Sequence, residues 1–436
     1  MMKSLVNVFK VPDLKKKVLF TLGILIVYRL GGHIPAPGIN AQALGEFFTS
    51  RGNTLFGMLD LFVGGNLSKA TIFALGIMPY ITASIVMQLL GGIIPYFEKL
   101  KKQGAEGQKK ITQYTRYGTV VIGIFNALGI TFFLESITTS SGVLIVSHPG
   151  LIFKLVTILT FVTGTIFVMW LGEQINDKGI GNGISLIIFV GIIARYPGGF
   201  INMGNMIING TMSLILAIFV IVLMIFVTAA VILVTEANRK IPVQYAKRVI
   251  GRKIYGGQST HIPLKVNSAG VIPIIFAQAV LMFPKTITTF FPQSDFMNTI
   301  SAWLSPGAFL YTVLYMLMII FFAYFYTAIV LNPVEIANNM KKYGGFIPGR
   351  KPGKKTADYI NSVITRITLP GAIFFAIIAV MPTFLIKYAK MPFYFGGTGL
   401  IIIVGVALDT LKQIESQLVM RHYDGFMKKG KLRGRR

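Results

Sequence analysis

Ten long apolar segments are the feature that most constrains what this chain can fold into. The hydrocarbon core of a bilayer is about 30 Å thick, so a helix rising about 1.5 Å per residue needs about 20 mostly apolar residues to cross it. The segments of about this length are residues 18–34, 70–91, 117–134, 151–172, 183–199, 211–234, 268–284, 308–331, 367–386 and 398–418. The fifth is the weakest, because Arg195 interrupts it. The sequence therefore predicts an all-α polytopic membrane protein with ten transmembrane helices.

The composition agrees with a membrane protein and removes several classes of function. Hydrophobic residues make up 53% of the chain and charged residues only 13%, whereas soluble domains carry about 25% charged residues. The chain contains no cysteine. Disulfide-stapled secreted modules, thiolate catalysis, iron–sulfur ligation and cysteine-built zinc sites are therefore excluded.

The distribution of charge predicts how the chain is oriented in the membrane. The 42 lysines and arginines outnumber the 15 aspartates and glutamates, which gives a formal net charge of +27. Most of these cations lie in the N-terminal tail, in the loops after even-numbered segments and in the C-terminal tail. Because short cytoplasmic loops carry an excess of Lys and Arg, we predict that both termini are cytoplasmic. Such a basic face is suited to anionic lipids, an acidic partner or RNA.

Two of the cytoplasmic loops, residues 236–267 and 332–366, are both long and basic. Bends are expected at the pairs Gly256-Gly257, Gly344-Gly345, Pro348-Gly349 and Pro352-Gly353. Charge alone would equally fit a topology signal with lipid headgroup contact. A topology signal needs only a few cations beside a helix end, so the length of these loops favours a docking surface.

Residues 53–65 form an apolar run that is too short to cross the bilayer and that ends at Gly64-Gly65. A half-length apolar helix broken by paired glycines is typical of a re-entrant or cavity-lining segment, because irregular backbone at membrane depth needs protein or water around it. The alternative is an interfacial helix that lies flat on the outer leaflet.

Few ionisable residues fall within the segments, which makes an enzyme the weakest class of function. Arg29, Glu135, Glu173, Arg195 and Asp409 lie near segment ends, where we expect their charged groups to snorkel to the interface. The segments contain no HExxH, GxSxG or phosphate-loop motif and no paired carboxylates. No cofactor and no metal site are predicted.

Neutral polar side chains occur instead, at Thr82, Gln88, Asn126 and Gln278. Each taken singly is best explained as an interhelical hydrogen bond, worth about 0.6 kcal/mol in measured cases. Three amides in separate segments could also form one polar seam, which would act as a weak clasp where two helices part and rejoin.

Several strings of residues closely resemble the bacterial SecY family, the pore subunits of the Sec protein-conducting channel. They are FALGIMPYITASI (73–85), QYTRYG (113–118), WLGEQI (170–175), GIGNGIS (179–185), QSTHIPLKVN (258–267) and PFYFGGT (392–398). The resemblance extends from about residue 11 to about residue 426. It agrees with the independent count of ten segments and two cytoplasmic termini.

The resemblance implies two five-span halves, residues 1–205 and 206–436, related by inverted pseudo-symmetry around an hourglass pore. Polypeptides would cross through the centre or leave sideways through a lateral gate. Residues 53–65 would be the plug that closes the outer funnel. Its apolar side chains would be Leu55, Phe56, Met58, Leu59, Leu61 and Phe62.

The resemblance also implies two sets of residues inside the membrane. The constriction would be an aliphatic ring of Ile77, Ile81, Ile188, Ile272 and Ile402, with Ile275 as an alternative in the seventh span. Ile77 and Ile81 are four residues apart and so share a helix face. The lateral gate would run past Thr82, Asn126 and Gln278, so the polar seam would coincide with it.

The two basic loops resemble docking loops for the ribosome and for the SecA ATPase. We expect surface contacts from Arg248, Arg252, Arg350 and Lys351. At the second loop tip the family usually has Gly, an aliphatic residue, Arg, Pro and Gly, whereas this chain has GRKPG at 349–353. Lysine therefore takes the arginine position, and an arginine precedes it, which displaces the planar bidentate fork by one residue.

The resemblance further implies the small partners SecE and SecG, signal-bearing precursor polypeptides as cargo and anionic lipids around the chain, with no small-molecule substrate. The location would be the bacterial plasma membrane. A secondary transporter is the main alternative, but it would be expected to place carboxylates near the midplane. A purely structural scaffold would leave the half-length segment unexplained.

Overall fold

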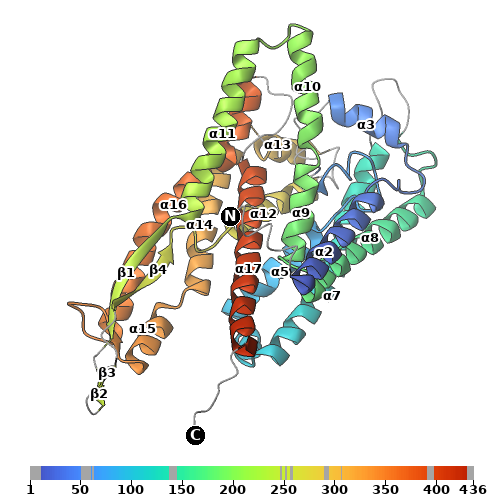
Figure 1. Cartoon of the computed structure of the whole chain (residues 1–436). Helices are drawn as coiled ribbons and strands as arrows, with labels where there is room; N and C mark the ends of the chain where they lie inside the picture. The colour runs from blue at the N-terminus through green and yellow to red at the C-terminus, as the bar shows by residue number, and fades with distance from the viewer. Residues whose placement is uncertain are drawn as a thin grey trace. The chain divides into compact units, whose positions relative to one another are not determined.

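The computed structural model of this chain describes residues 11–50, 60, 63–136, 145–245, 248–250, 253–255, 259–288, 294–305, 307–389 and 397–429. Helices dominate these residues (Figure 1). Each of the ten apolar segments contains one. They are α2 (Pro12–Gly31), α5 (Met78–Ile93), α7 (Ala105–Ser136), α8 (Leu151–Lys178), α9 (Gly183–Ile193), α11 (Leu214–Glu236), α12 (Ile272–Thr288), α14 (Phe309–Val330), α16 (Lys354–Ala389) and α17 (Gly397–Lys429).

Length and composition qualify most of these helices as membrane spans. Seven stretches of the described chain are long and apolar enough by themselves, and the bent pair α5 and α6 (Pro95–Lys102) brings the number to eight. The other two are α2, which has three lysines near its start at residues 15–17, and α12, whose apolar part covers Ile272–Leu281. This count is consistent with the ten predicted spans. The shorter helices are α3 (Ala41–Ser50), α10 (Tyr196–Ile208), α13 (Asp295–Trp303) and α15 (Pro333–Lys342).

The second predicted span, 70–91, was wrong at its beginning. Residues 72–77 are turns, and α5 begins only at Met78. Gly76 has a φ of 54°, a left-handed conformation that stops a helix from extending backwards. Pro79 fits in the first turn of α5, where its missing N–H costs no hydrogen bond.

The other end of the same span bends sharply. The axes of α5 and α6 differ by 97°. Ile94, which links them, has an extended backbone with φ −96° and ψ 120°. Pro95 explains the bend, because proline disfavours helical backbone in the residue before it.

The two basic loops fold together into a small β structure that the sequence did not predict. Strand β1 (Asn238–Tyr245) pairs antiparallel with β4 (Ser259–Lys265) and with β5 (Gly345–Phe346), in the order β4-β1-β5. Strands β2 (Arg248–Ile250) and β3 (Lys253–Tyr255) form a separate hairpin. Since β5 comes from the second loop, the two loops are one folded piece.

A hydrophobic core lies beneath this sheet. Its buried side chains include Ile241 and Val243 of β1, Leu264 of β4, Met340 of α15 and Ile360 of α16. These apolar side chains remove the sheet from water on one face, which is what allows so short a sheet to be stable.

Glycines make the predicted bends of the second loop. Gly344, Gly349 and Gly353 have φ values of 71°, 77° and 99°. Side chains with a Cβ rarely adopt such angles, so these three bends are confirmed as glycine turns. The pair Gly256-Gly257 lies outside the described residues.

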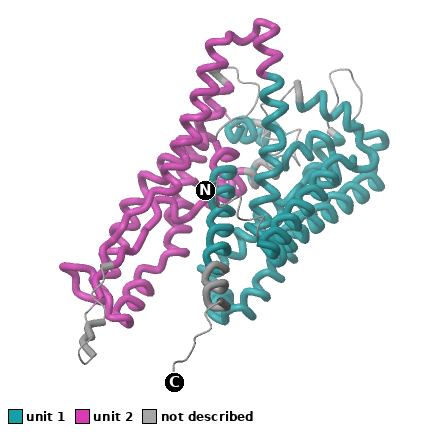
Figure 2. Tube along the Cα trace, in the orientation of Figure 1, with its two compact units in different colours: residues 1–202, 284–306, 402–436 teal, residues 203–283, 307–401 magenta. Residues whose placement is uncertain are grey.

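The chain divides into two compact units (Figure 2). Unit 1 contains Met1–Asn202, Pro284–Pro306 and Ile402–Arg436, and unit 2 contains Met203–Phe283 and Gly307–Ile401. The two units are defined by which residues pack together. The predicted halves, 1–205 and 206–436, are instead defined by an internal symmetry of the chain. The halves therefore remain a prediction.

Most of α17 belongs to unit 1, and specific contacts hold it there. The Gln413 side chain accepts a hydrogen bond from the Gly181 N–H at 3.1 Å. Leu14, Ile180 and Ile414 form a small buried cluster next to it. The last span is thus fastened to the loop between α8 and α9.

We predict that Gly164→Ala destabilises the fold. A Cβ at Gly164 in α8 would overlap the carbonyl oxygen of Ile72, so the backbone would have to move. Overpacking of this kind costs about 1–3 kcal/mol. The measurement is thermal unfolding of the purified chain in lipid nanodiscs.

The matched control is Gly23→Ala in α2, where an added Cβ meets no atom within 4 Å. Gly23→Ala should leave the midpoint of thermal unfolding unchanged or raise it, because alanine is favoured over glycine in a helix by about 1 kcal/mol. Equal shifts for both variants would contradict the close approach of α8 to Ile72.

Candidate functional site

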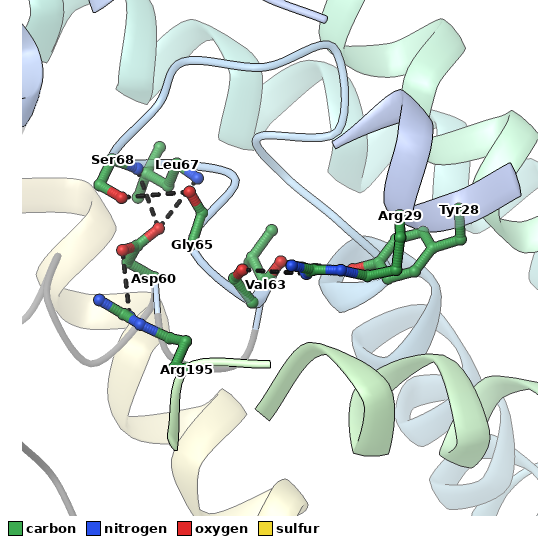
Figure 3. A network of polar contacts seen from close by, with 9 residues as sticks. Tyr28, Arg29, Asp60, Val63, Gly65, Leu67, Ser68 and Arg195 are labelled. Atoms are coloured by element: carbon green, nitrogen blue, oxygen red, sulfur yellow. Dashed lines mark hydrogen bonds and ion pairs between the residues drawn. The ribbon is translucent and has the colours of Figure 1, made fainter. Parts of the chain in front are cut away.

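The candidate site begins where the half-length segment ends. The six predicted plug side chains, Leu55, Phe56, Met58, Leu59, Leu61 and Phe62, lie outside the described residues. The described part is Asp60 together with residues 63–68, which we call the glycine turn. This turn contacts the ends of two helices of unit 1, α2 and α9 (Figure 3).

Two glycines allow the turn to approach α9. Gly64 and Gly65 have φ values of 74° and 86°. A Cβ on Gly64 would lie 2.6 Å from the Cα of Gly191 in α9, so two backbones meet here without intervening side chains. Val63 is buried beside Gly76. This burial within protein favours the re-entrant interpretation of the segment over a helix lying flat on a leaflet.

Asp60 holds the turn together from inside. Its side chain is only 1% exposed. One carboxylate oxygen, Oδ1, accepts hydrogen bonds from the N–H groups of Leu67 and Ser68 at 3.0 and 2.9 Å. The backbone carbonyl of Asp60 accepts another from Gly65 at 2.8 Å. The carboxylate is therefore part of the folded turn rather than a surface charge.

The second carboxylate oxygen of Asp60 faces α9. It lies 3.1 Å from Nη1 of Arg195, an ion pair without the alignment of a hydrogen bond (Figure 3). Arg195 follows α9 directly, one helical turn after Gly191. Snorkelling of Arg195 to the interface stays a prediction, and the structure adds to it an ion pair between the guanidinium and a buried carboxylate.

The end of α2 holds the glycine turn from its other side. The Tyr28 hydroxyl donates to the Val63 carbonyl at 3.3 Å and accepts from the Asn66 amide at 3.3 Å. Nη1 of Arg29 donates to the Gly64 carbonyl at 3.4 Å. Each of these hydrogen bonds is longer than the usual 2.9–3.0 Å and is correspondingly weak.

Four of the five predicted ring residues are buried, and all four belong to unit 1. Ile77 immediately precedes α5, and its carbonyl accepts the N–H of Ile81 at 3.1 Å, so the two lie one turn apart on one face. Both are buried, as are Ile188 of α9 and Ile402 of α17. Ile272 is the first residue of α12 in unit 2, where it is half-buried, as is its alternative Ile275.

The three predicted gate residues lie in three helices. Thr82 of α5 bonds its hydroxyl to the Met78 carbonyl of its own helix at 3.1 Å. Asn126 of α7 is half-buried. Gln278 of α12 is 4% exposed, and its Oε1 has no hydrogen-bond partner among the described residues.

The predicted docking cations differ in how firmly they are held. The guanidinium of Arg350 lies over the ring of Tyr359, 5.0 Å from its centre. Lys351 is exposed, and only its backbone carbonyl is engaged, by the Thr356 hydroxyl at 2.9 Å. Arg248 begins β2, and Arg252 lies outside the described residues.

Other charged residues at the span ends are paired between neighbouring helices. Arg116 of α7 makes two hydrogen bonds of 2.8 Å to Glu173 of α8. Lys154 of α8 lies 3.0 Å from Glu135 of α7. In the described part of the chain, no group of three or more metal-binding side chains comes together.

The Asp60–Arg195 pair was not predicted, although the sequence contains a signal for it. Asp60 is the only acidic residue in the apolar run 53–65, and Arg195 is the charge that interrupts the fifth span. Two opposite charges, each costly at membrane depth, are expected to seek each other.

Comparison with known proteins settles the family. A family model described as SecY matches residues 71–411. The chain belongs to the SecY family. The resemblance drawn from the sequence motifs is thus confirmed.

Two SecY relatives illustrate how far the similarity extends. The protein translocase subunit SecY of Aquifex aeolicus is 45% identical over 98% of this chain and 100% of its own length. The subunit of the same name from Escherichia coli strain K12 is 46% identical over 97% of this chain and 96% of its own length.

Solved structures show the same fold at lower identity. A protein-conducting channel superposes with a TM-score of 0.67 at 21% identity, covering 93% of both chains. A SecY structure in which the plug domain stabilises the closed state gives 0.65 at 22% identity, covering 93% of this chain and 92% of that one. Sec61 in a canine ribosome-channel complex gives 0.63 at 20% identity, covering 93% of both.

Proposed function

We propose that this chain is the central pore subunit of the Sec translocon. It passes unfolded secretory polypeptides across the bacterial plasma membrane and releases transmembrane helices through a lateral gate. The observation that carries this proposal is the identity of about 45% to named SecY translocase subunits over nearly the whole chain. The role is that of a channel, not an enzyme.

The proposed orientation places both termini and both basic loops in the cytoplasm. The excess of Lys and Arg in these parts supports it. The ends of α2 and α9 that hold the glycine turn then face the outer side of the membrane. A plug formed by residues 53–65 would close the pore from that side.

The proposed constriction consists of Ile77, Ile81, Ile188, Ile272 and Ile402. A ring of apolar side chains blocks small ions, because a narrow apolar passage expels water. The same ring offers a passing polypeptide no specific bond, so an extended chain can slide through. The burial of the four ring residues in unit 1 supports this role.

The proposed lateral gate uses the polar side chains of Thr82, Asn126 and Gln278. The oxygen Oε1 of buried Gln278 supports it, because this acceptor has no partner in the described part of the chain and is therefore able to take a new donor. A hydrophobic signal helix would separate the gate helices and expose its own apolar face to lipid.

The proposed partners are SecE and SecG within the membrane and the ribosome or the SecA ATPase at the basic loops. The Sec61 neighbour in a ribosome-channel complex supports the ribosome in particular. The sequence has no phosphate-loop motif, so the energy for transport would come from a partner. Signal-bearing precursors are the cargo, and anionic lipids surround the basic face.

Transport itself is the first test of this function. Sealed vesicles containing this chain with a SecE partner receive SecA, ATP and a signal-bearing precursor, and the protease-protected precursor is measured. We expect protection that requires both ATP and the signal. Vesicles without this chain are the control, and absence of protection despite confirmed partner assembly would contradict the proposal.

Substitution of the five ring isoleucines by glycine should make resting vesicles leak ions. Removing the apolar side chains lets water fill the constriction, so conductance should rise about tenfold or more if the closed state loses about 1.4 kcal/mol. The measurement is ion flux without precursor. Glycine at the exposed isoleucines Ile124, Ile218 and Ile377 controls for weakened helices, and an equal leak there would contradict the ring assignment.

Lys351→Glu should weaken binding of the ribosome or SecA several-fold without lowering the thermal stability of the chain. Lys351 is exposed, so its charge acts on the partner, and the contact should weaken further with salt. Arg350→Glu should lower both the affinity for the partner and the thermal stability of the chain. The stability falls because the substitution also removes the stacking on Tyr359, worth about 0.5–1 kcal/mol. Binding is measured by titration at two salt concentrations.

Lys109→Glu provides the matched control, since Lys109 is an exposed cation near the start of α7, outside both basic loops. If Lys109→Glu weakens binding as much as Lys351→Glu does, the partner senses net charge and the loop tip has no special role.

A further inference from the structure

Helices α7 and α8 are joined by two ion pairs that lie far apart along them. Toward the ends that we place in the cytoplasm, Arg116 of α7 donates two hydrogen bonds of 2.8 Å to Glu173 of α8, one to each carboxylate oxygen. Toward the opposite ends, Lys154 of α8 lies 3.0 Å from Glu135 of α7. Each helix thus contributes one cation and one anion. An antiparallel pairing in this one register gives every charge an opposite partner.

The spacing of the two ion pairs matches the thickness of a membrane. Nineteen residues separate Arg116 from Glu135 in α7, and nineteen separate Lys154 from Glu173 in α8. At 1.5 Å per residue this is about 28 Å along each helix, close to the roughly 30 Å of the hydrocarbon core. The four side chains are between 16% and 50% exposed. Each pair is therefore suited to one surface of the membrane, where a charge is far less costly than at the midplane.

The pair of Lys154 and Glu135 is also tied to the beginning of α8. The Lys154 ammonium lies over the ring of Phe132, 4.4 Å from its centre. Glu135 accepts a hydrogen bond of 3.3 Å from the N–H of Gly150, the residue directly before α8. A carboxylate at the start of a helix is favoured by the helix dipole. This end of α7 is thus held by several polar contacts at once.

Between the two ion pairs, α7 packs closely on its neighbours through glycine. A Cβ added at Gly118 would lie 3.4 Å from the Cβ of Ala83 in α5, and one added at Gly123 would lie 3.8 Å from Val162 in α8. Small residues of this kind let helices approach each other in a membrane, where van der Waals packing holds them together. Helices α5, α7 and α8 belong to unit 1. We call these three packed helices the gate wall.

Asn126, a residue of the proposed lateral gate, lies midway between the two ion pairs. It is ten residues from Arg116 and nine from Glu135. A helix that is fixed at one end can tilt about that end. A helix that is fixed at both ends can neither tilt nor slide along its neighbour without breaking an ion pair. The position of Asn126 on α8 is therefore set from both sides.

We propose that Arg116, Glu173, Lys154 and Glu135 are positioning residues, which keep α7 and its Asn126 fixed on α8 while the lateral gate opens. This inference rests on the proposed function.

The consequence concerns which helices part when a signal helix enters. Thr82 of α5 and Asn126 of α7 both belong to the gate wall, whereas Gln278 is carried by α12 of unit 2. The gate therefore parts between the wall and α12, and not within the wall. A signal helix meets one fixed surface and one helix that moves.

The first measurement follows the two helices without any need for transport. The chain has no native cysteine, so spin labels can be attached through Val121→Cys in α7 and Leu155→Cys in α8, both at exposed positions. Double electron-electron resonance is recorded on the full chain with its SecE partner in vesicles. We expect one narrow distance distribution, which does not shift when a precursor is arrested in the channel.

Arg116→Gln together with Lys154→Gln should broaden this distribution, because both ion pairs are then lost. A shift caused by the precursor in the otherwise unchanged chain would overturn the fixed wall. An unchanged distribution in the variant with both substitutions would overturn the ion pairs as its cause.

Transport by charge-swapped variants tests whether the fixed position matters for function. Arg116→Glu places two carboxylates together and should lower SecA-driven transport of a signal-bearing precursor about tenfold. Adding Glu173→Arg restores an opposite pair and should return transport to within about twofold of wild type. Vesicles are compared at equal amounts of folded chain. Additive losses in the swapped variant would overturn the role of this pair.

Lys102→Glu is the matched control for charge. It makes the same change of sign in another ion pair, Lys102 with Glu98, which lies within the short helix α6. This variant should transport within about twofold of wild type, because an exposed pair inside one helix contributes little. A loss as large as that of Arg116→Glu would show that transport responds to net charge, and would overturn the proposal.

Cross-linking distinguishes the fixed helices from the moving one. Glu135→Cys and Lys154→Cys, joined by a bifunctional maleimide, should transport as well as the same chain before joining. Asn126→Cys and Gln278→Cys, joined across the proposed gate, should stop transport. Failure of wild-type transport would overturn the channel itself. Loss of transport on joining α7 to α8 would overturn the fixed wall alone.

Discussion

Hydrocarbon offers no hydrogen-bond partner to a peptide group, and the rest of this structure depends on that constraint. Ten helices satisfy their own backbone, and most of the cations lie outside the apolar stretches of these helices. Where the described backbone is irregular, over residues 63–77, it is enclosed by α2, α9 and its own side chains. The unusual glycine turn exists because Asp60 supplies the acceptors that a helix would otherwise provide.

The same constraint explains how well the sequence predicted the spans and why it misplaced one end. A run of about 20 apolar residues has one dominant solution in a bilayer, so each predicted segment contains a helix. Apolarity does not distinguish helix from buried turn, however. The start of α5 is determined by the conformation of Gly76 and by Pro79, which the hydrophobic pattern does not register.

The β structure of the basic loops was not predictable for a different reason. Only Ile241 and Val243 of β1 point into a core, and the flanking cations hide this alternation. Its partner β5 comes from about one hundred residues further along and contributes only Gly345 and Phe346. Pairing at such a distance depends on tertiary packing and leaves no local pattern.

The candidate site was predictable in its parts but not in its contacts. Family motifs gave Ile77, Ile81, Ile188 and Ile402, and all four are buried. The partner of Arg195 could not be read from the sequence, because position near a span end suits both a hydrated charge and a paired one. The structure also distinguishes two neighbouring cations that the sequence could not rank. Arg350 packs against the ring of Tyr359, whereas the side chain of Lys351 is exposed.

Helix α16 connects the tip of the second basic loop directly to an apolar span. It begins at Lys354, directly after the loop tip, and continues to Ala389 without a break. At 1.5 Å per residue its 36 residues make a rod about 54 Å long. Pro370 and Pro382 lie within it and are the points where such a rod bends. A force applied at the loop tip would therefore be transmitted along α16 and taken up at these two prolines.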